Sequence, residues 1–250
     1  MIGPMQPIVV LGGFLISAES YTAMLTSLEQ LSGQPASLVA VGKPEWLLTV
    51  FPFAWARILD RVAAVVCEQA SRSPTGRVTL IGHSSGGIML RLFLDDRPFQ
   101  GRCYGGRRWA DTLVMLGSPH TALEATPLRA MVAERLPGSW FSDPSHIAGL
   151  KGATLVQYIS VAGDLALDDP DTTATARRLA PTAYRKASGS AEGPGDGLVP
   201  LSSALLEGSQ AVVLPGVAHG GAFGRRWYGS QEVVEQWWPQ LKAPGVPPPR

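Results

Sequence analysis

The stretch Arg77-Val-Thr-Leu-Ile-Gly-His-Ser-Ser-Gly-Gly-Ile-Met-Leu-Arg91 decides the fold of this chain. Its apolar beginning, Val78 to Ile81, predicts a buried strand, and the spacing of apolar residues from Ser85 to Leu94 predicts a helix. Between them, residues 82–86 match the pattern G-x-S-x-G of a nucleophile elbow. In that turn the serine, Ser84, is strained, and a Cβ on either flanking glycine would collide with backbone. The alternative is a glycine-rich connection, but a strand before it and a helix after it favour the elbow.

Composition limits the classes of protein to which the chain can belong. It has 250 residues, 45% of them hydrophobic, which is enough for a substantial core. Its formal net charge is +1 and it has no basic block, so we expect no nucleic-acid partner. The two cysteines, Cys67 and Cys103, lack C-x-x-C spacing and fit a reducing compartment, with one bridge left open.

The first apolar run predicts a strand and a loop, not a targeting segment. It spans Ile8 to Ile16, is interrupted by two glycines and follows no positive charge, so we expect no signal peptide. No apolar run is long enough to span a bilayer. We therefore expect a cytoplasmic protein that meets lipid, if at all, by transient contact with a membrane surface. The sequence leaves the oligomeric state open.

Apolar strands and amphipathic helices alternate along the chain. Further strands are expected at residues 8–11, 38–41, 112–116, 155–161 and 211–214, and helices at about 20–31, 54–70, 128–136, 174–185 and 231–241, with an apolar loop at 46–55. This alternation predicts an α/β fold, with a mostly parallel central sheet flanked by helices on both faces. We expect one domain over residues 1–242, with a small cap insertion at about 121–150 and a polar insertion at about 164–195. Residues 243–250 are proline-rich and predict a disordered tail.

A serine nucleophile needs a base to remove its proton and a carboxylate to orient that base. In this type of fold the order along the chain is serine, acid, histidine. His219 lies in a glycine-rich loop directly after the last strand, so it is the candidate base. His83 adjoins the serine but should point elsewhere, whereas His120 and His146 precede any plausible acid. Two aspartates are candidate acids, Asp196 in a turn and Asp164 directly after a strand.

An oxyanion hole needs two backbone N–H groups directed at the developing charge. The N–H of Ser85, at the beginning of the elbow helix, is one candidate. The loop after the first strand should supply the other, and Phe14, behind Gly12-Gly13, is the candidate. A nucleotide-binding loop is the weaker interpretation of these glycines, because neither G-x-G-x-x-G nor a glycine-lysine pair is present.

Taken together, these motifs resemble the α/β-hydrolase superfamily, and within it the lipase-like and esterase-like acyl hydrolases, including those of cyanobacteria and plants. The resemblance spans about residues 8–241 and is carried by Gly12-Gly13-Phe14, residues 82–87, Gly117-Ser118-Pro119-His120, Asp196-Gly-Leu-Val-Pro200, His219 and Trp227-Tyr228-Gly229. It implies an α/β-hydrolase fold with Ser84 as nucleophile, Asp196 as acid and His219 as base. It also implies that the N–H groups of Phe14 and Ser85 form the oxyanion hole.

The expected reaction is hydrolysis of a carboxylic ester, of a small molecule or a lipid, through an acyl-enzyme and without cofactor or metal. An apolar acyl group is expected, because Leu15 would line the mouth of the site and the cap would contribute Leu128, Met131, Trp140 and Phe141. The alternative for the cap is an ordinary amphipathic helix that covers the core. Thioesterase or acyltransferase activity could use the same triad. The remaining alternative is a non-catalytic binding protein on a hydrolase scaffold.

Overall fold

The elbow strand lies inside a sheet of parallel strands. The computed structural model describes residues 6–137, 156–170 and 172–241. Within them one sheet has the order β2-β1-β3-β4-β5-β6, every neighbouring pair being parallel. The strands are β1 (Ile8–Leu11), β2 (Ala36–Val39), β3 (Val78–His83), β4 (Ala110–Leu116), β5 (Gln157–Asp164) and β6 (Gln210–Pro215). Strand order reverses between β1 and β3, and in such sheets the crevice at the carboxyl ends of the two strands is where sites form.

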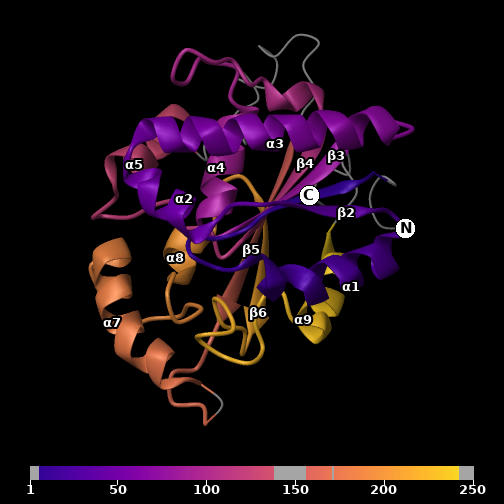
Figure 1. Ribbon diagram of the computed structural model, residues 1–250. Helices are drawn as coiled ribbons and strands as arrows, with labels where there is room; N and C mark the ends of the chain where they lie inside the picture. Colours follow the sequence, from indigo (N-terminus) through magenta and orange to yellow (C-terminus); the bar gives the residue numbers. More distant parts are fainter. Residues whose placement is uncertain (1–5, 138–155, 171, 242–250) are drawn as a thin grey trace, which may run out of the picture.

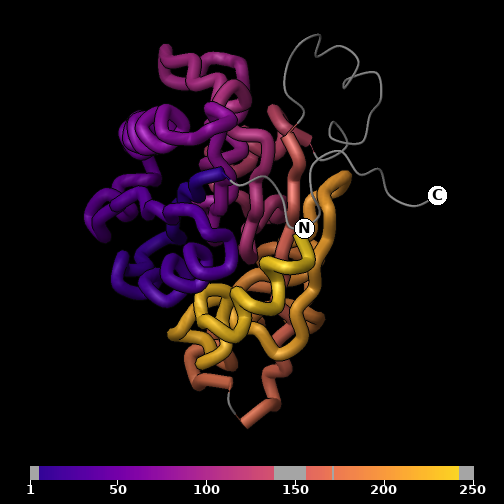
Figure 2. The backbone as a smooth tube through the Cα atoms, turned by 90° about the vertical axis from the view of Figure 1, so that its right-hand side faces the viewer, coloured from indigo at the N-terminus to yellow at the C-terminus, as the bar shows by residue number. Residues whose placement is uncertain are grey.

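Helices cover both faces of the sheet (Figure 1), which confirms the predicted α/β architecture. On one face lie α3 (Pro52–Arg72) and α4 (Ser85–Leu94), and on the other α1 (Thr22–Ser32) and α9 (Gln231–Trp237). Figure 2 shows α9, in yellow, beside the indigo α1, so the beginning and the end of the chain close the same face.

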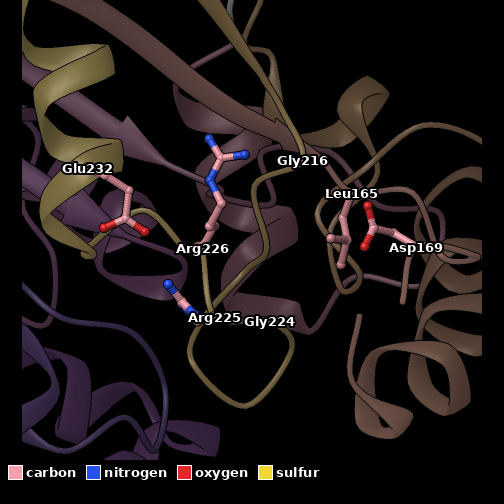
Figure 3. A pocket seen from close by; sticks show the side chains of 7 residues that line it. All are labelled: Leu165, Asp169, Gly216, Gly224, Arg225, Arg226 and Glu232. Carbon is pink, nitrogen blue, oxygen red and sulfur yellow. The ribbon is translucent and has the colours of Figure 1, made fainter. Parts of the chain in front are cut away.

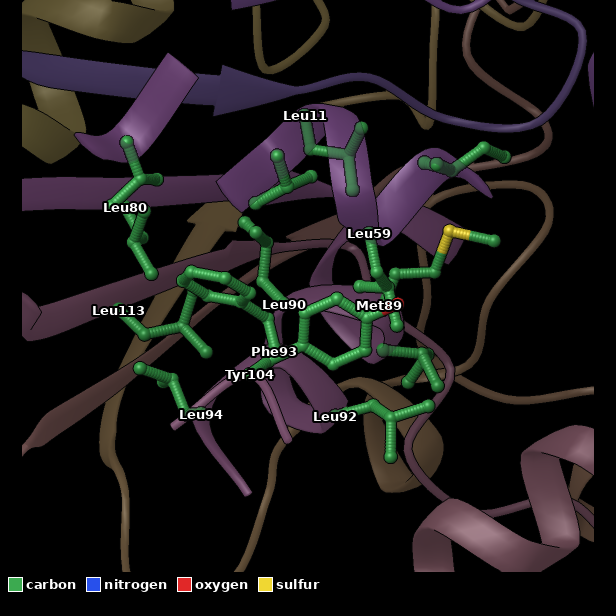
Figure 4. Close-up of a cluster of buried hydrophobic side chains, with 14 of the residues drawn as sticks. Leu11, Leu59, Leu80, Met89, Leu90, Leu92, Phe93, Leu94, Tyr104 and Leu113 are labelled. Carbon is green, nitrogen blue, oxygen red and sulfur yellow. The ribbon is translucent and has the colours of Figure 1, made fainter. Parts of the chain in front are cut away.

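The core has two parts, one on each face of the sheet, because successive side chains along a strand point to opposite faces. In β1, Val9 and Leu11 pack towards α3 and α4, whereas Ile8 and Val10 pack towards α1 and α9. Figure 4 shows the first cluster, in which strand leucines meet Leu59 of α3 and a row of residues from α4. Strands buried on both faces of a parallel sheet are expected to be apolar throughout. Strands β1 and β3 are buried at every residue, whereas the edge strand β6 alternates between buried and exposed residues.

The remaining elements lie mostly around the carboxyl ends of the strands. They are α2 (Lys43–Leu47), α5 (Pro127–Arg135), α7 (Ala174–Ser188) and α8 (Leu201–Ala204), with single 3-10 turns at Ala18–Tyr21, Leu48–Val50, Gly106–Arg108 and Trp238–Gln240. Within the described ranges, no helix is long and apolar enough to cross a membrane. Both cysteines are exposed and unbridged.

Several predicted elements differ from the structure. Strand β5 was expected at 155–161 and is Gln157–Asp164, and the last helix was expected to reach residue 241 but ends at Trp237, before a 3-10 turn. Strand β2 lies two residues earlier than expected, because Ala36 rather than Leu38 is paired with Ile8 at the beginning of β1. The stretch 46–55, expected as an apolar loop, contains instead the end of α2, a 3-10 turn and the beginning of α3. Helix α2 begins at a capping interaction in which Gly42 N–H donates to Glu45 Oε2 at 2.8 Å. The predicted tail lies outside the described residues, as does part of the predicted cap, residues 138–150. The domain limits and insertions stay predictions.

Candidate active site

Ser84 occupies a strained turn between β3 and α4. Its φ of 54° and ψ of −123° lie outside the regions that a residue with a side chain ordinarily adopts, a strain of about 1–3 kcal/mol. The flanking glycines make the turn feasible. A Cβ on Gly82 would lie 2.5 Å from Gly87 N, and one on Gly86 would lie 2.6 Å from Gly12 O. The turn is therefore fixed by backbone packed against backbone, and it leaves the Ser84 side chain at the edge of a cavity.

The structure brings Ser84, His219 and Asp196 together. His219 Nε2 lies 3.0 Å from Ser84 Oγ, and His219 Nδ1 lies 2.8 Å from Asp196 Oδ2. All three residues are buried. The rival acid, Asp164, ends β5 and receives Gly216 N–H on its backbone carbonyl at 2.7 Å, whereas the His219 ring bonds to Asp196. Of the two candidate acids, Asp196 is therefore the one in contact with the histidine.

The Asp196 carboxylate accepts four hydrogen bonds. Backbone N–H groups of Leu198 and Val199 donate to Oδ1 at 3.0 and 2.7 Å. Oδ2 receives His219 Nδ1 and the Tyr228 hydroxyl, each at 2.8 Å. Burial, and then the charge of Asp196, raises the pKa of Tyr228 well above its ordinary value, so the phenol stays a neutral donor. A buried carboxylate whose oxygens are satisfied in this way can keep the imidazole in one orientation.

A second chain of hydrogen bonds connects the loop after β1 to the histidine. Gly13 N–H donates to Tyr21 Oη at 2.7 Å, and Tyr21 Oη lies 2.8 Å from His83 Nδ1. His83 Nε2 lies 2.8 Å from the His219 carbonyl oxygen. Burial, and then the proximity of His219, lowers the pKa of His83 well below its ordinary value. A neutral ring whose Nε2–H donates to the carbonyl and whose Nδ1 accepts from Tyr21 satisfies all these partners.

The candidate oxyanion donors lie on either side of Ser84. A Cβ on Gly13 would lie 3.0 Å from Ser84 Cβ, so the loop after β1 packs directly on the nucleophile. In that loop Gly13 N–H is used by Tyr21 and Ile16 N–H by the Gly13 carbonyl, at 3.3 Å. Among the described residues, the N–H groups of Phe14 and Ser85 have no acceptor. They are thus available to a ligand beside Ser84.

The predicted substrate-pocket residues are divided between the core and the surface. Leu128 of α5 is buried in the core cluster and Met131 packs against that cluster, as expected of a helix that covers the core. Leu15 is exposed and lines a cavity of about 450 Å³ together with Ile16, Ser17, Ser20, Lys43, residues 220–223 and Trp227. Trp140 and Phe141 lie outside the described residues.

The cavity that contains Ser84 has a volume of about 250 Å³. Its lining also includes Pro119, Ala122, Glu124, Arg129, Ala183, Lys186, Ala187, Leu198, Val199 and Pro200. Sequence reasoning missed Arg129, as it missed Tyr21 and the donor role of Tyr228. The one sequence signal for any of these three residues was the resemblance at Trp227-Tyr228-Gly229, which pointed to Tyr228.

Other potential sites are separate from the triad. A cavity of about 470 Å³ is lined by charges of both signs, Arg225 and Arg226 with Asp169 and Glu232 (Figure 3), and no triad residue lines it. His120 is buried, with Nδ1 3.1 Å from Arg91 Nη1, and takes no part in the triad; His146 lies outside the described residues. Over the described part of the chain, no group of three or more His, Cys, Asp or Glu could hold a metal ion.

Comparisons with known proteins support the architecture. Neither a protein-family model nor a curated protein matches the sequence. Among solved structures, Est1E from Butyrivibrio proteoclasticus, solved with ferulic acid bound, is similar with a TM-score of 0.51 and 13% identity over 95% of this chain and 90% of that one. The lin2722 gene product from Listeria innocua has a TM-score of 0.50 and 14% identity over 93% and 92%.

A putative hydrolase of the alpha/beta superfamily from Xanthomonas campestris aligns at a TM-score of 0.47 and 13% identity over 94% of this chain and 98% of that one. Structural similarity at identities this low is evidence about the fold and gives no information about the substrate. The fold follows from the structure of this chain, because a parallel sheet with flanking helices and a strained nucleophile elbow at the carboxyl end of β3 are the features of an α/β-hydrolase. The chain therefore has the α/β-hydrolase fold.

Proposed function

We propose that this protein is a serine hydrolase that cleaves carboxylic esters, with Ser84 as nucleophile, His219 as general base and Asp196 as the acid that orients it. One observation carries the proposal: the continuous hydrogen-bonded chain from Ser84 Oγ through His219 to the Asp196 carboxylate, at a strained elbow. A serine hydroxyl is a weak nucleophile until a positioned base accepts its proton, and this chain places the base within reach.

In the proposed reaction, Ser84 Oγ attacks the ester carbonyl while His219 Nε2 takes its proton. The N–H groups of Phe14 and Ser85 stabilise the oxyanion, each contributing on the order of 3 kcal/mol. His219 then gives the proton to the departing alcohol, which leaves an acyl-enzyme. A water molecule, deprotonated by the same ring, releases the carboxylic acid and restores Ser84.

The proposal extends to esters with an apolar acyl group that are presented at a lipid surface. Five of the seven residues from 47 to 53 are large, apolar and exposed, Val50 at 74%. Phe51 and Phe53 stack with ring centroids 5.6 Å apart, and the Arg57 guanidinium lies over the Phe53 ring. Phe14 contacts Trp46 of α2, next to this segment. A contiguous apolar patch next to the candidate site is typical of contact with lipid.

The central test is Ser84→Ala, assayed with p-nitrophenyl butyrate and with a fluorophosphonate probe that labels activated serines. We expect turnover to fall by about 10⁴-fold or more and labelling to disappear, because the acyl-enzyme can no longer form. Circular dichroism should show an unchanged fold. Wild-type protein that neither turns over esters nor reacts with the probe would instead support the non-catalytic scaffold.

The same assay addresses the finer points. Wild-type rates on a matched thioester, and with added alcohol as acceptor, would identify thioesterase or acyltransferase activity. If lipid surfaces are the natural setting, turnover of a medium-chain ester should rise when the ester passes from solution to an emulsion. An equal rate on the dissolved and the emulsified ester would contradict action at a lipid surface, while the proposed ester hydrolysis would stand.

A further inference from the structure

The cavity beside Ser84 is lined by a cation, Arg129, that forms no ion pair with the part of the chain that the structure describes. Arg129 lies in the first turn of α5 and, like Ser84, lines this cavity. Its Nη2 donates to Ser85 Oγ at 3.1 Å, so the guanidinium is held next to the residue that follows the nucleophile. Among the described residues, no acidic side chain forms an ion pair with Arg129. An arginine has five N–H donors, and Ser85 uses one of them.

The helix that carries Arg129 is fixed at both ends. At its beginning Thr126 accepts Arg129 N–H on its hydroxyl. At its end Arg135 forms an ion pair with the buried Asp95 at 2.7 Å, and the Arg91 guanidinium donates to the Leu136 carbonyl. Leu128 and Val132 hold the same helix on the core. Arg129 is thus pre-organised, which lowers the entropic cost of binding a ligand through it.

The surrounding charges do not neutralise Arg129. Lys186 and Glu124 also line the cavity, but they pair with each other at 4.0 Å and are both exposed. Their charges cancel, so the net charge of the described residues that line the cavity is positive and comes from Arg129. Burial lowers the pKa of Arg129, which indicates that its charge is incompletely compensated where it lies.

We propose that this cavity binds an anionic group of the substrate, a carboxylate or a phosphate, through the Arg129 guanidinium. The proposal rests on the proposed ester hydrolysis at Ser84 and names the class of ester: one with an anionic group a few bonds from the scissile carbonyl. A planar guanidinium suits such a group because it can donate two parallel hydrogen bonds. The volume of about 250 Å³ suits a short charged arm.

This assignment divides the substrate between two surroundings. The charged arm occupies the cavity of Arg129, whereas apolar parts lie towards Leu15 and the exposed segment 47–53. An ester of this kind is amphiphilic. The anion can be attached on the acyl side or on the alcohol side, and the test has one arm for each.

The test compares pairs of esters that differ only in a terminal group. Ethyl hexanoate and monoethyl adipate differ on the acyl side, and pentyl acetate and 5-acetoxypentanoate differ on the alcohol side. For each pair we measure the ratio of kcat/KM, charged over neutral, in wild-type protein and in Arg129→Gln. We expect the wild-type ratio to be larger for the pair whose charged arm reaches Arg129 than for the other pair. Arg129→Gln should lower this larger ratio by about 10- to 100-fold, as for a lost charge-assisted hydrogen bond.

Arg178→Gln is the matched control, because Arg178 is an exposed arginine of α7 that does not line the cavity, and its ratio should equal that of wild type. If Arg129 only positions Ser85, Arg129→Gln will lower turnover of both members of a pair equally, and the unchanged ratio will overturn the proposal. Arg129→Lys should recover part of the ratio.

A binding measurement separates this proposal from the proposed function. Calorimetric titration of Ser84→Ala with adipate and with the uncharged hexanamide requires no turnover. Binding of adipate that is lost in Ser84→Ala/Arg129→Gln supports the anion site even if no ester is hydrolysed. A different result would refute the anion site: Ser84→Ala abolishes ester hydrolysis, but the wild type does not prefer the charged esters and adipate does not bind. The proposed ester hydrolysis would then still stand.

Discussion

The two halves of the candidate site are built in different ways. The nucleophile half is one contiguous segment, β3 and α4, whose turn is fixed by backbone atoms that touch across Gly82 and Gly86. The other half consists of the turn at Asp196 and the loop at His219, which hydrogen bonds from distant residues hold in place. One such bond runs from Gly163 N–H to Tyr228 Oη at 2.7 Å, and another connects His83 with the His219 carbonyl.

This difference has a physical consequence. Steric contact between backbones permits one geometry and no adjustment, because a protein interior is close-packed. A hydrogen-bonded loop has more freedom, and its geometry depends on each partner being present. Substitutions of the close-packed glycines in the nucleophile half should therefore act on folding, whereas those in the other half should act on turnover of a folded protein.

The largest effect is expected for Gly86→Ala. The new Cβ would lie 2.6 Å from Gly12 O, so β1 and the elbow must separate. We expect the free energy of unfolding to fall by about 3 kcal/mol or more, measured by urea unfolding. Gly221→Ala is the control, because a Cβ there meets nothing within 4 Å. A stable Gly86→Ala variant would contradict the steric account of the elbow.

Asp196→Asn should act on turnover instead. The amide cannot accept from Leu198 N–H, Tyr228 and His219 as the carboxylate does, and it favours the wrong tautomer of the imidazole. We expect kcat to fall by about 10⁴-fold, as in other triads, with the fold retained. Asp164→Asn should change kcat by less than about threefold. The opposite result for the two variants would identify Asp164 as the acid.

The smallest effect is a dependence of stability on pH. Burial lowers the pKa of His83 and of His120 in the folded protein, whereas in the unfolded chain each titrates at about pH 6.5. Below that pH the unfolded chain binds more protons, so stability present above about pH 6.5 should be lost as the pH falls, by up to about 1.4 kcal/mol per pH unit for each histidine.

Urea unfolding at about pH 7.5 and about pH 5.5 measures this loss. His83→Gln should remove the contribution of one ring and so make the dependence weaker. A pH dependence identical to that of the wild type would show that folding does not lower the pKa of His83, and would contradict the neutral ring assigned to it.

Sequence patterns predicted best the segments whose structure is local. The predicted helix Ser85–Leu94 has the bounds of α4, because apolar spacing and the glycine turn both act within a few residues. Helix α2 was not predicted, and its last two residues were placed in the apolar loop 46–55, where the exposed apolar side chains leave no periodic stripe. The Pro44 and Glu45 signals of a capped helix start were present there.

Long-range contacts were harder to predict. The order of residues along the chain indicated His219, but the partnership of Tyr21 with His83, and of Tyr228 with Asp196, depends on how separate elements pack. The position of Arg129 beside Ser84 could not be predicted from the sequence for the same reason. Leu128 and Arg129 are neighbours on one helix, and only the docking of α5 determines that the leucine enters the core and the arginine the cavity.

The pairing of α1 with α9 has a consequence for synthesis of the protein on the ribosome. Tyr21 packs against Trp227, and the face of the sheet to which both belong is closed by α9. Until this late segment emerges, the inner face of α1 has no cover, and neither His219 nor Tyr228 is present to complete the site. The nascent chain must therefore stay inactive, with an apolar surface that needs shielding, until the segment from His219 to α9 has been translated.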